Sequence, residues 1–374
     1  MLSLTGNTFD PDKDIPDLTG KDYIVTGGSA GIGFGITAHL LQHNANSITI
    51  LSNKEEHANS ALEELKEYGD TNRVHWTKCD LEDLKLVDEV ANKLAQSQKK
   101  IDGLILNAGL GVGVYNETKD RLDSHFQVNH LSQFHLMLKL LPNLRDTPNS
   151  RIVLESSELH RGSTADTKFE NEAEINRDIG PTKLYNRTKL ALILTVRALQ
   201  RRIDAGQLGF QPGARVYVNA VHPGGVETDQ PLQAEEAYGM LGVIGHNLIK
   251  PFMKDPVSQG CRPALFAATS KEVEEQGITG KYIVPDKKVT DPSKDAQATL
   301  DSQRADNQGQ TRWNVSYYGT DFWPSLIPGV TLLQLACTST TSTRIFKSRQ
   351  QWLFELEASY RGKYIPSLAN ITIL

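Results

Sequence analysis

Cysteine is scarce in this sequence of 374 residues, and its 40 basic residues are outnumbered by 45 acidic ones. Its three cysteines, Cys79, Cys261 and Cys337, are far apart and lack CxxC or Cys/His ligand spacing, so neither a disulfide framework nor a zinc site is predicted. The formal net charge of −5 provides no basic field that would hold a polyanion. We therefore expect no nucleic-acid partner, and any phosphate must be bound by local structure.

Long hydrophobic runs are also missing. The longest apolar run near the end, at 330–337, is too short to span a bilayer. The first 20 residues contain no basic segment followed by an apolar run, so they are not typical of a secretory signal, and they provide no apolar anchor. These features predict a cytoplasmic protein without a membrane span.

Between about residues 21 and 285, short apolar runs alternate with longer segments of helical period, which is typical of βαβ units. The predicted strands are 23–27, 47–51, 74–80, 101–109, 151–157, 215–225 and 281–285. The predicted helices are 32–43, 55–68, 86–96, 120–141 and 184–203. The sequence therefore predicts an α/β fold, a Rossmann-type doubly wound parallel sheet of about seven strands over 21–290. An N-terminal arm (1–20) would lie on the surface, and 291–374 would form a linker and an unassigned tail.

The stretch "IVTGGSAGIGFG" runs from the first strand into a helix. Missing side chains at Gly27, Gly31 and Gly33 would allow a tight turn and a close backbone approach to a pyrophosphate at the helix N-terminus. We predict that these glycines, with Ser29 and Ile32, hold a dinucleotide. A plain strand-to-helix turn is the alternative, and the position after the first strand of an alternating chain disfavours it.

The end of the second strand bears on the choice between NAD and NADP. An acidic residue there would bond the ribose 2′-OH and repel a 2′-phosphate. This sequence has Ser52, Asn53 and Lys54 instead, which can all donate to a phosphate. NADP(H) is therefore favoured over NAD(H), with a solvated Lys54 at a helix start as the alternative.

Two nearly identical Tyr/Lys pairs occur in the chain. Tyr115 lies in a glycine-rich stretch that predicts a loop, and its partner Lys119 is expected to begin a helix. Tyr185 and Lys189 fall four residues apart at the start of a long apolar-periodic helix, on one face. An ammonium held there is expected to lower the pKa of the phenol toward working pH, as a general acid–base requires.

Other polar residues could complete such a site. Ser156 and Ser157 end a predicted strand, at the edge where open α/β sheets bind ligands, and a serine hydroxyl there could hydrogen-bond a substrate carbonyl. Asn129 lies within a predicted helix, where asparagine is a poor helix former, so a polar role is favoured.

Five ordered motifs carry a family resemblance: "TGGSAGIG", "NAG" at 107–109, Asn129, the serine pair before "YNRTK", and "VHPGGVET" at 221–228. In order and spacing the chain resembles the classical short-chain dehydrogenase/reductase (SDR) family over roughly residues 17–290. Within that family it is most similar to the retinol-dehydrogenase-like and WW-domain-oxidoreductase-like branch of fungal type.

The resemblance implies a role for each matching position. Tyr185 would be the acid–base, with Lys189 lowering its pKa and binding the nicotinamide ribose. Ser157 would polarise the carbonyl, with Ser156 as the weaker candidate, and Asn129 would hold a water in a proton relay. The further cofactor residues that it implies are Asp80 and Leu81 near the adenine, Asn107, Ala108 and Gly109 in the cofactor floor, and Pro223, Gly224, Val226 and Thr228 at the nicotinamide end.

One departure from compact family members concerns the 28 residues from Ser157 to Tyr185 (185 − 157 = 28), about twice the usual separation. The extra segment, 158–183, is expected to flank the substrate mouth together with 110–116 and 226–250.

The sequence therefore predicts an NADP(H)-dependent oxidoreductase that interconverts a carbonyl and an alcohol on a mostly apolar small molecule. A role in secondary metabolism is compatible with the fungal resemblance. A homodimer is an assembly that the sequence leaves open. One alternative is a non-catalytic NAD(P)-binding scaffold or sensor. The other is an epimerase or dehydratase of the extended type, whose TGxxGxxG spacing differs from the TGxxxGxG found here. His39 and His43, four residues apart, have no third ligand nearby, so no metal site is predicted.

Overall fold

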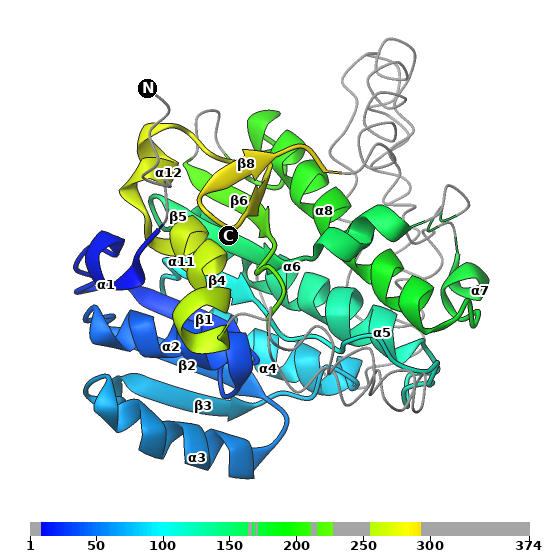
Figure 1. Cartoon of the computed structure of the whole chain (residues 1–374), viewed down its shortest axis with the longest axis horizontal. Coiled ribbons are helices and arrows are strands. Elements are labelled where there is room, and N and C mark those ends of the chain that lie inside the picture. Colours follow the sequence, from blue (N-terminus) through cyan, green and yellow to red (C-terminus); the bar gives the residue numbers. More distant parts are fainter. Residues whose placement is uncertain are drawn as a thin grey trace, which may run out of the picture. The chain divides into compact units, whose positions relative to one another are not determined.

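The computed structural model describes residues 9–163, 167, 169, 171–210, 215–226 and 255–292. These residues form an eight-stranded sheet in the order β3-β2-β1-β4-β5-β6-β7-β8 (Figure 1). Neighbouring strands are parallel except β8, which is antiparallel to β7. The strands are β1 (Asp22–Thr26), β2 (Ser47–Ser52), β3 (Val74–Lys78), β4 (Gly103–Leu106), β5 (Ser150–Glu155), β6 (Val216–Val221), β7 (Lys281–Val284) and β8 (Lys288–Thr290).

The predicted α/β fold is confirmed, and all seven predicted strands are present. The eighth strand was not predicted, because three residues that include one lysine and one threonine carry no hydrophobic pattern. Its hairpin depends on Asp286 and Lys287, which both adopt positive φ (68° and 57°), a conformation that reverses the chain tightly.

Helices cover both faces of the sheet (Figure 1). One face packs against α2, α3 and α11, and the other against α4, α6 and α8. The long helices are α2 (Gly31–Gln42), α3 (Glu55–Glu64), α4 (Leu84–Ser97), α6 (Ser132–Arg145), α8 (Pro181–Asp204) and α11 (Arg262–Thr269), and the short ones are α1 (Pro11–Asp14), α5 (Ser124–Phe126), α7 (Glu172–Ile175) and α12 (Lys271–Glu275). No helix within the described residues is long and apolar enough to cross a membrane.

The helix predicted over 120–141 differs in its start and in its interior. It begins only at Ser124, where Asp123 caps the backbone N–H of Phe126 at 3.0 Å, and it contains a π-helical segment, Gln127–Leu131. Lys119 lies in the preceding turn, in an ion pair with Asp83, so the expectation that Lys119 begins a helix is wrong.

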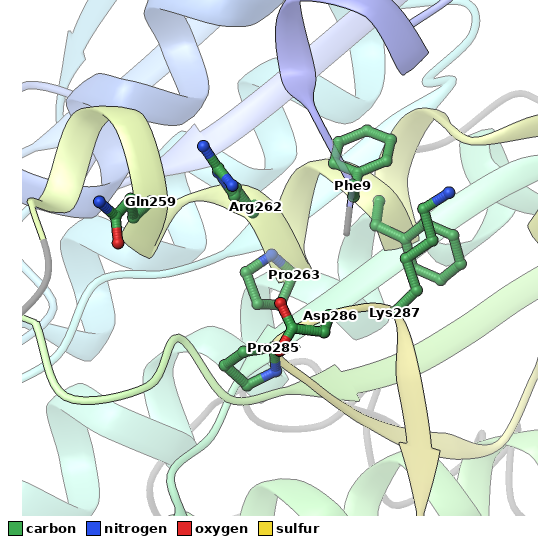
Figure 2. A pocket seen from close by; sticks show the side chains of 8 residues that line it. Phe9, Gln259, Arg262, Pro263, Pro285, Asp286 and Lys287 are labelled. Carbon is green, nitrogen blue, oxygen red and sulfur yellow. The ribbon is translucent and has the colours of Figure 1, made fainter. Parts of the chain in front are cut away.

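The N-terminal arm contributes to the core from residue 9 onward. Phe9, Ile15 and Leu18 are buried, and the Phe9 ring packs edge-on against Phe266 of α11 with 5.7 Å between centroids. Phe9 and Lys287 are among the residues that line a hollow of about 30 Å³, and Figure 2 shows their side chains. Although a surface position was expected, these apolar side chains gain burial against α11, which fixes the arm there.

Candidate active site

The candidate residues gather at one edge of the sheet, because parallel strands place their carboxyl ends together. They follow β1, β2, β3, β4, β5 and β6 in the chain. In the observed order β1 lies between β2 and β4, so the connections diverge to either side of β1. This switch point between β1 and β4 is where open α/β sheets bind ligands.

The glycine loop has the shape that a pyrophosphate requires. Gly27 and Gly31 adopt positive φ (67° and 51°), and a Cβ on Gly33 would lie 2.1 Å from the carbonyl oxygen of Gly27. Ser29 and Ile32 are half-buried beside them. No side chain in the described part of the chain caps the start of α2, so backbone N–H groups there remain to receive an anion. The loop therefore fits the phosphates of a dinucleotide.

The predicted cofactor floor is held by a residue at the end of β1. The Thr26 hydroxyl accepts from the backbone N–H of Asn107 (2.9 Å) and of Ala108 (3.1 Å), and Gln133 donates to the Ala108 carbonyl (2.8 Å). Gly109 follows, half-buried. Thr26 and Gln133 were not predicted, because a threonine in a strand and a glutamine in a helix carry no signal of this contact.

Ser52, Asn53 and Lys54 lie where β2 meets α3, as expected. The Ser52 hydroxyl accepts from the Trp76 indole N–H at 2.9 Å, while Asn53 and Lys54 are exposed. Lys54 is the residue that precedes α3, and its ammonium forms no ion pair within the described residues. The exposed pair is thus open to a ligand, whereas the serine oxygen already has a donor.

Asp80 and Leu81 follow β3 at the same edge. Asp80 is half-buried and accepts from the backbone N–H of Glu82 at 3.0 Å, which leaves its second carboxylate oxygen for another donor. Leu81 is buried, and its carbonyl accepts from the Ser132 hydroxyl at 2.6 Å. This arrangement is compatible with an amino group near Asp80.

The predicted nicotinamide end is described in part. Pro223 and Gly224 follow β6, with Gly224 at φ 92°. Val226 is buried close to Gly260, where an added Cβ would meet the valine side chain at 2.8 Å. Thr228 and the rest of the expected wall up to 250 lie outside the described residues.

Tyr185 and Lys189 share one face of α8, as their spacing predicted. Both are buried, at 7% and 3% exposure, and the Lys189 ammonium lies 5.3 Å from the centroid of the Tyr185 ring. The ammonium donates to the backbone carbonyl of Glu155, the last residue of β5, at 2.8 Å. Helix α8 is thereby tied to the carboxyl end of the central strand.

The two serines differ in what they contact. The Ser156 hydroxyl is buried and donates to the backbone carbonyl of Lys189 at 2.9 Å, so it is occupied inside the fold. The Ser157 side chain lies beside the Tyr185 phenol, whose pKa it acts to lower, and its hydroxyl oxygen accepts from the backbone N–H of Leu159 at 3.2 Å. These contacts favour Ser157 over Ser156 as the residue that would meet a substrate.

The pKa of Tyr185 is raised, whereas the sequence predicted that it would be lowered. Burial raises it to about 12, the hydrogen bond from Ser157 acts to lower it, and the charge of Glu155 raises it. Lys189 does not lower it as predicted, because the ammonium lies over the ring and donates to Glu155. Burial also lowers the pKa of Lys189 itself, while the Glu155 carboxylate raises it.

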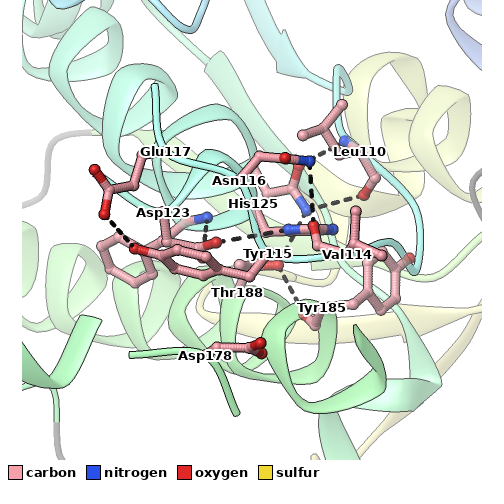
Figure 3. A network of polar contacts seen from close by, with 12 residues as sticks. Leu110, Val114, Tyr115, Asn116, Glu117, Asp123, His125, Asp178, Tyr185 and Thr188 are labelled. Atoms are coloured by element: carbon pink, nitrogen blue, oxygen red, sulfur yellow. Dashed lines mark hydrogen bonds and ion pairs between the residues drawn. The ribbon is translucent and has the colours of Figure 1, made fainter. Parts of the chain in front are cut away.

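Asn129 lies fully buried inside the π-helical segment and joins three parts of the site. Its amide N–H groups donate to the Leu110 carbonyl (3.0 Å) and the Thr188 hydroxyl (3.1 Å), and its oxygen accepts from the Leu110 N–H (2.6 Å). Figure 3 shows Leu110 and Thr188 on either side of this network. Single π turns within α-helices are frequent at functional sites, because they redirect one side chain.

The second Tyr/Lys pair is separated by the fold. The Tyr115 hydroxyl lies within hydrogen-bond distance of the Asn176 carbonyl (3.0 Å) and of Glu117 (3.2 Å), and Lys119 pairs with Asp83 instead. Figure 3 shows Tyr115 beside Glu117, away from the Tyr185 phenol. Tyr115 therefore braces a loop, and among the described residues it has no ammonium partner.

Helix α7, in the described part of the segment 158–183, packs onto this same region. Arg187 of α8 donates to the carbonyls of Glu174 (2.9 Å) and Ile175 (2.7 Å) and forms a buried ion pair with Asp123 (3.2 Å). Asn176 receives the backbone N–H of Asp123 at 3.0 Å. The described part of the segment is thus fixed against α5 and α8, next to the loop that carries Tyr115.

A cavity of about 340 Å³ lies at the opposite, amino-terminal edge of the sheet. It is lined by Lys21, Asp102, Arg151 and Glu274 among others, and by none of the predicted site residues. The candidate active site is therefore defined by its convergent polar residues and not by this cavity.

Comparison with known proteins gives a consistent picture. A family model described as short chain dehydrogenase matches residues 21–166. The chain is 37% identical over 265 residues to "Putative oxidoreductase bli-4, mitochondrial" of Neurospora crassa, covering 68% of this chain and 64% of that protein, less than two thirds of its length. It is 32% identical over 299 residues to a short-chain dehydrogenase/reductase of Armillaria gallica (76% and 90% covered). It is 31% identical over 282 residues to retinol dehydrogenase 14 of Mus musculus (71% and 78% covered).

Solved structures support the fold. A structure of an uncharacterised protein from Mycobacterium paratuberculosis matches with a TM-score of 0.58 at 23% identity, covering 79% of this chain and 94% of that one. A structure titled as the Pseudomonas aeruginosa RhlG/NADP active-site complex matches with a TM-score of 0.54 at 22% identity, covering 72% and 95%. At such identities the likeness concerns the fold alone.

Proposed function

Since the chain belongs to the short-chain dehydrogenase/reductase family, in its retinol-dehydrogenase-like and WW-domain-oxidoreductase-like branch, we propose that it is an NADP(H)-dependent enzyme that interconverts a carbonyl and an alcohol. Its substrate would be a mostly apolar small molecule. The observation that carries the proposal is the contact of the Ser157 hydroxyl with the Tyr185 phenol, one helical turn from Lys189, at the sheet edge that holds the glycine loop.

The chemistry is divided between the cofactor and the chain. The nicotinamide, when bound, supplies or accepts the hydride. Tyr185 gives its proton to the carbonyl oxygen in reduction and removes a proton from the alcohol in oxidation. Ser157 hydrogen-bonds the same oxygen as charge develops on it. Lys189, one helical turn from Tyr185, would hold the nicotinamide ribose.

Asn129 takes part through the loop that it fixes. Its amide holds the backbone of Leu110 and the Thr188 hydroxyl, which leaves its oxygen one free acceptor position. We propose that a water held near Asn129 relays protons between Lys189 and solvent.

The preference for NADP(H) rests on residues that follow β2. Asn53 and Lys54 are exposed at the point where a 2′-phosphate would lie, and no carboxylate stands at that position. Asp80 would meet the adenine amino group at the end of the next strand. The glycine loop and the floor from Asn107 to Gly109 would hold the remainder, together with Pro223, Gly224, Val226 and Thr228.

The first experiment is a titration of purified protein with NADPH and with NADH, followed by nicotinamide fluorescence. We expect tighter binding of NADPH, and a panel of aldehydes and ketones then identifies a substrate. On that substrate Tyr185→Phe should lower kcat by about 10²- to 10⁴-fold. The matched control Tyr115→Phe removes an equivalent hydroxyl from the bracing loop and should retain turnover. Full activity of Tyr185→Phe would refute the mechanism.

We also propose a cytoplasmic location, a role in secondary metabolism and a homodimer as the assembly to test first. One relative carries the word mitochondrial in its name, so fractionation with mitochondrial and cytosolic markers is the informative measurement. Recovery with the mitochondrial marker would contradict the cytoplasmic location. Light scattering after size exclusion measures the mass of the assembly.

A further inference from the structure

His160 is a fully buried histidine to which the proposed mechanism gives no role. It belongs to a 3₁₀ turn, Glu158–Gly162, which begins directly after Ser157. A buried imidazole needs partners for its ring nitrogens, because an unpaired polar atom in a protein interior is costly. The contacts of this ring therefore indicate what it does.

The imidazole of His160 contacts the backbone of Ser157. Its Nδ1 atom lies 2.6 Å from the Ser157 carbonyl oxygen. A carbonyl oxygen accepts hydrogen bonds and cannot donate them, so Nδ1 carries a proton in this contact. Burial lowers the pKa of His160 below its usual value, and the ring is therefore neutral at pH 7. A neutral imidazole has a single N–H, and the contact assigns that N–H to Nδ1.

The same turn holds Ser157 at its carbonyl and at its side chain. The backbone N–H of His160 also donates to the Ser157 carbonyl, at 3.1 Å. The Ser157 hydroxyl oxygen accepts from the backbone N–H of Leu159 at 3.2 Å. Since the oxygen is occupied as an acceptor there, the hydroxyl proton is left to be donated to a substrate oxygen. The bonds from the turn thus fix the direction of the Ser157 side chain.

The His160 ring is itself held in place by packing. It lies edge-on to the ring of Tyr282 in β7, with 5.0 Å between centroids and 76° between planes. The Tyr282 hydroxyl donates to the Glu158 carboxylate at 3.0 Å, so β7 contacts the turn at two residues. The turn also packs closely on α8, where a Cβ on Gly162 would lie 2.4 Å from the side-chain amide of Asn186. The imidazole N–H therefore has one fixed direction.

We propose that His160 is a positioning residue whose Nδ1–H, through the Ser157 carbonyl, holds the Ser157 hydroxyl in the orientation that meets the substrate oxygen beside Tyr185. His160 itself touches neither substrate nor cofactor in this assignment. The inference rests on the proposed function, in which Ser157 hydrogen-bonds the carbonyl oxygen of the substrate.

Two replacements of His160 separate the hydrogen bond from the packing. His160→Phe keeps a ring against Tyr282 and removes the N–H, whereas His160→Asn removes the ring and places an amide N–H near the position of Nδ1. We expect His160→Phe to lower kcat by about tenfold to a hundredfold and to leave NADPH affinity unchanged, because a displaced Ser157 hydroxyl affects the reacting oxygen only. His160→Asn should retain most of the wild-type kcat. A larger loss of kcat in His160→Asn than in His160→Phe would refute the proposal.

A double-mutant cycle shows whether His160 acts through Ser157. In a Ser157→Ala background, His160→Phe should cause little further loss of kcat, because the hydroxyl that it orients is absent. The same fold loss in both backgrounds would overturn the proposal.

His135 of α6 provides a matched control. It is also buried, and its ring bonds to Asp88 at 2.8 Å, with no contact to any residue of the candidate active site. We expect His135→Phe to lower stability and to leave kcat unchanged. If His135→Phe lowered kcat as much as His160→Phe does, the loss would reflect the removal of any buried histidine, and the proposal would be wrong.

A second readout does not depend on turnover. The Leu159 amide donates to the Ser157 hydroxyl, so its hydrogen exchange reports how firmly that hydroxyl is held. His160→Phe should speed this exchange by about tenfold, and His135→Phe should not. Unchanged exchange in His160→Phe would overturn the inference even if Tyr185→Phe confirms the proposed function. If Tyr185→Phe instead retains full activity, the proposed function fails, and the exchange rate still decides whether His160 holds the Ser157 hydroxyl.

The wild-type protein provides the test if neither variant of His160 folds. In protein with isotope-labelled histidine, the ring nitrogen resonances of His160, assigned through its backbone, distinguish the Nδ1–H tautomer from the Nε2–H tautomer. We expect the Nδ1–H tautomer at pH 7. An Nε2–H tautomer cannot donate to the Ser157 carbonyl from Nδ1, and its observation would refute the proposal.

Discussion

Replacing Arg187 with methionine should both destabilise the protein and release the segment that flanks the candidate active site. The guanidinium is 2% exposed, and it pairs at 3.2 Å with Asp123, which is fully buried. It also donates to the carbonyls of Glu174 and Ile175, at 2.9 and 2.7 Å. Methionine keeps most of the apolar volume of the arginine stem, so the change removes mainly the charge and its hydrogen bonds.

The magnitude follows from what is left behind. Breaking a buried ion pair by removing one partner costs about 3–5 kcal/mol, because the remaining charge stays buried without compensation. Here that charge is Asp123, which keeps its bond to the backbone N–H of Phe126 at 3.0 Å. The two carbonyls that end α7 lose a charged donor as well. We therefore expect Arg187→Met to lower the unfolding free energy by about 3–5 kcal/mol.

The energy of the ion pair is measured by a double-mutant cycle. Chemical denaturation gives the unfolding free energies of Arg187→Met, of Asp123→Asn and of the double variant. The double variant removes both charges, so it should lose about 1–3 kcal/mol less than the sum of the single variants. Release of α7 should also raise KM more than it lowers kcat. A loss below about 1 kcal/mol for Arg187→Met, or strict additivity in the cycle, would refute the reasoning.

Two further predictions concern cofactor choice and the serine pair. Lys54→Glu should weaken NADPH binding by about tenfold or more and change NADH binding little, because a carboxylate that repels the 2′-phosphate replaces an ammonium that donates to it. Equal losses of affinity for both cofactors in the fluorescence titration would contradict this prediction. Ser157→Ala should lower kcat/KM with little change in stability, whereas Ser156→Ala should cost about 1 kcal/mol in denaturation, by loss of its bond to the Lys189 carbonyl, and retain turnover. The reverse pattern would exchange the roles of the two serines.

The predictions from the sequence that were wrong concern residues whose contacts lie in distant parts of the chain. The arm was expected on the surface, but Phe9 is buried against Phe266 of α11, more than 250 positions away. Lys119 was expected to begin a helix, but its ammonium pairs with Asp83. Neither partner could be identified from local composition, because both contacts depend on how helices pack around the sheet.

The strands, the main helices, the glycine loop and the order of the motifs were determined by the sequence alone. Those features depend on hydrophobic periodicity and on residue types at short spacing, which the chain carries locally. Only the tertiary structure decided that the Ser156 hydroxyl is bonded to the Lys189 carbonyl and that the Lys189 ammonium donates to the Glu155 carbonyl. Both contacts form because the end of β5 packs against one face of α8. Strand register and helix packing bring these two elements together, although the contacting residues are more than 30 positions apart in the sequence.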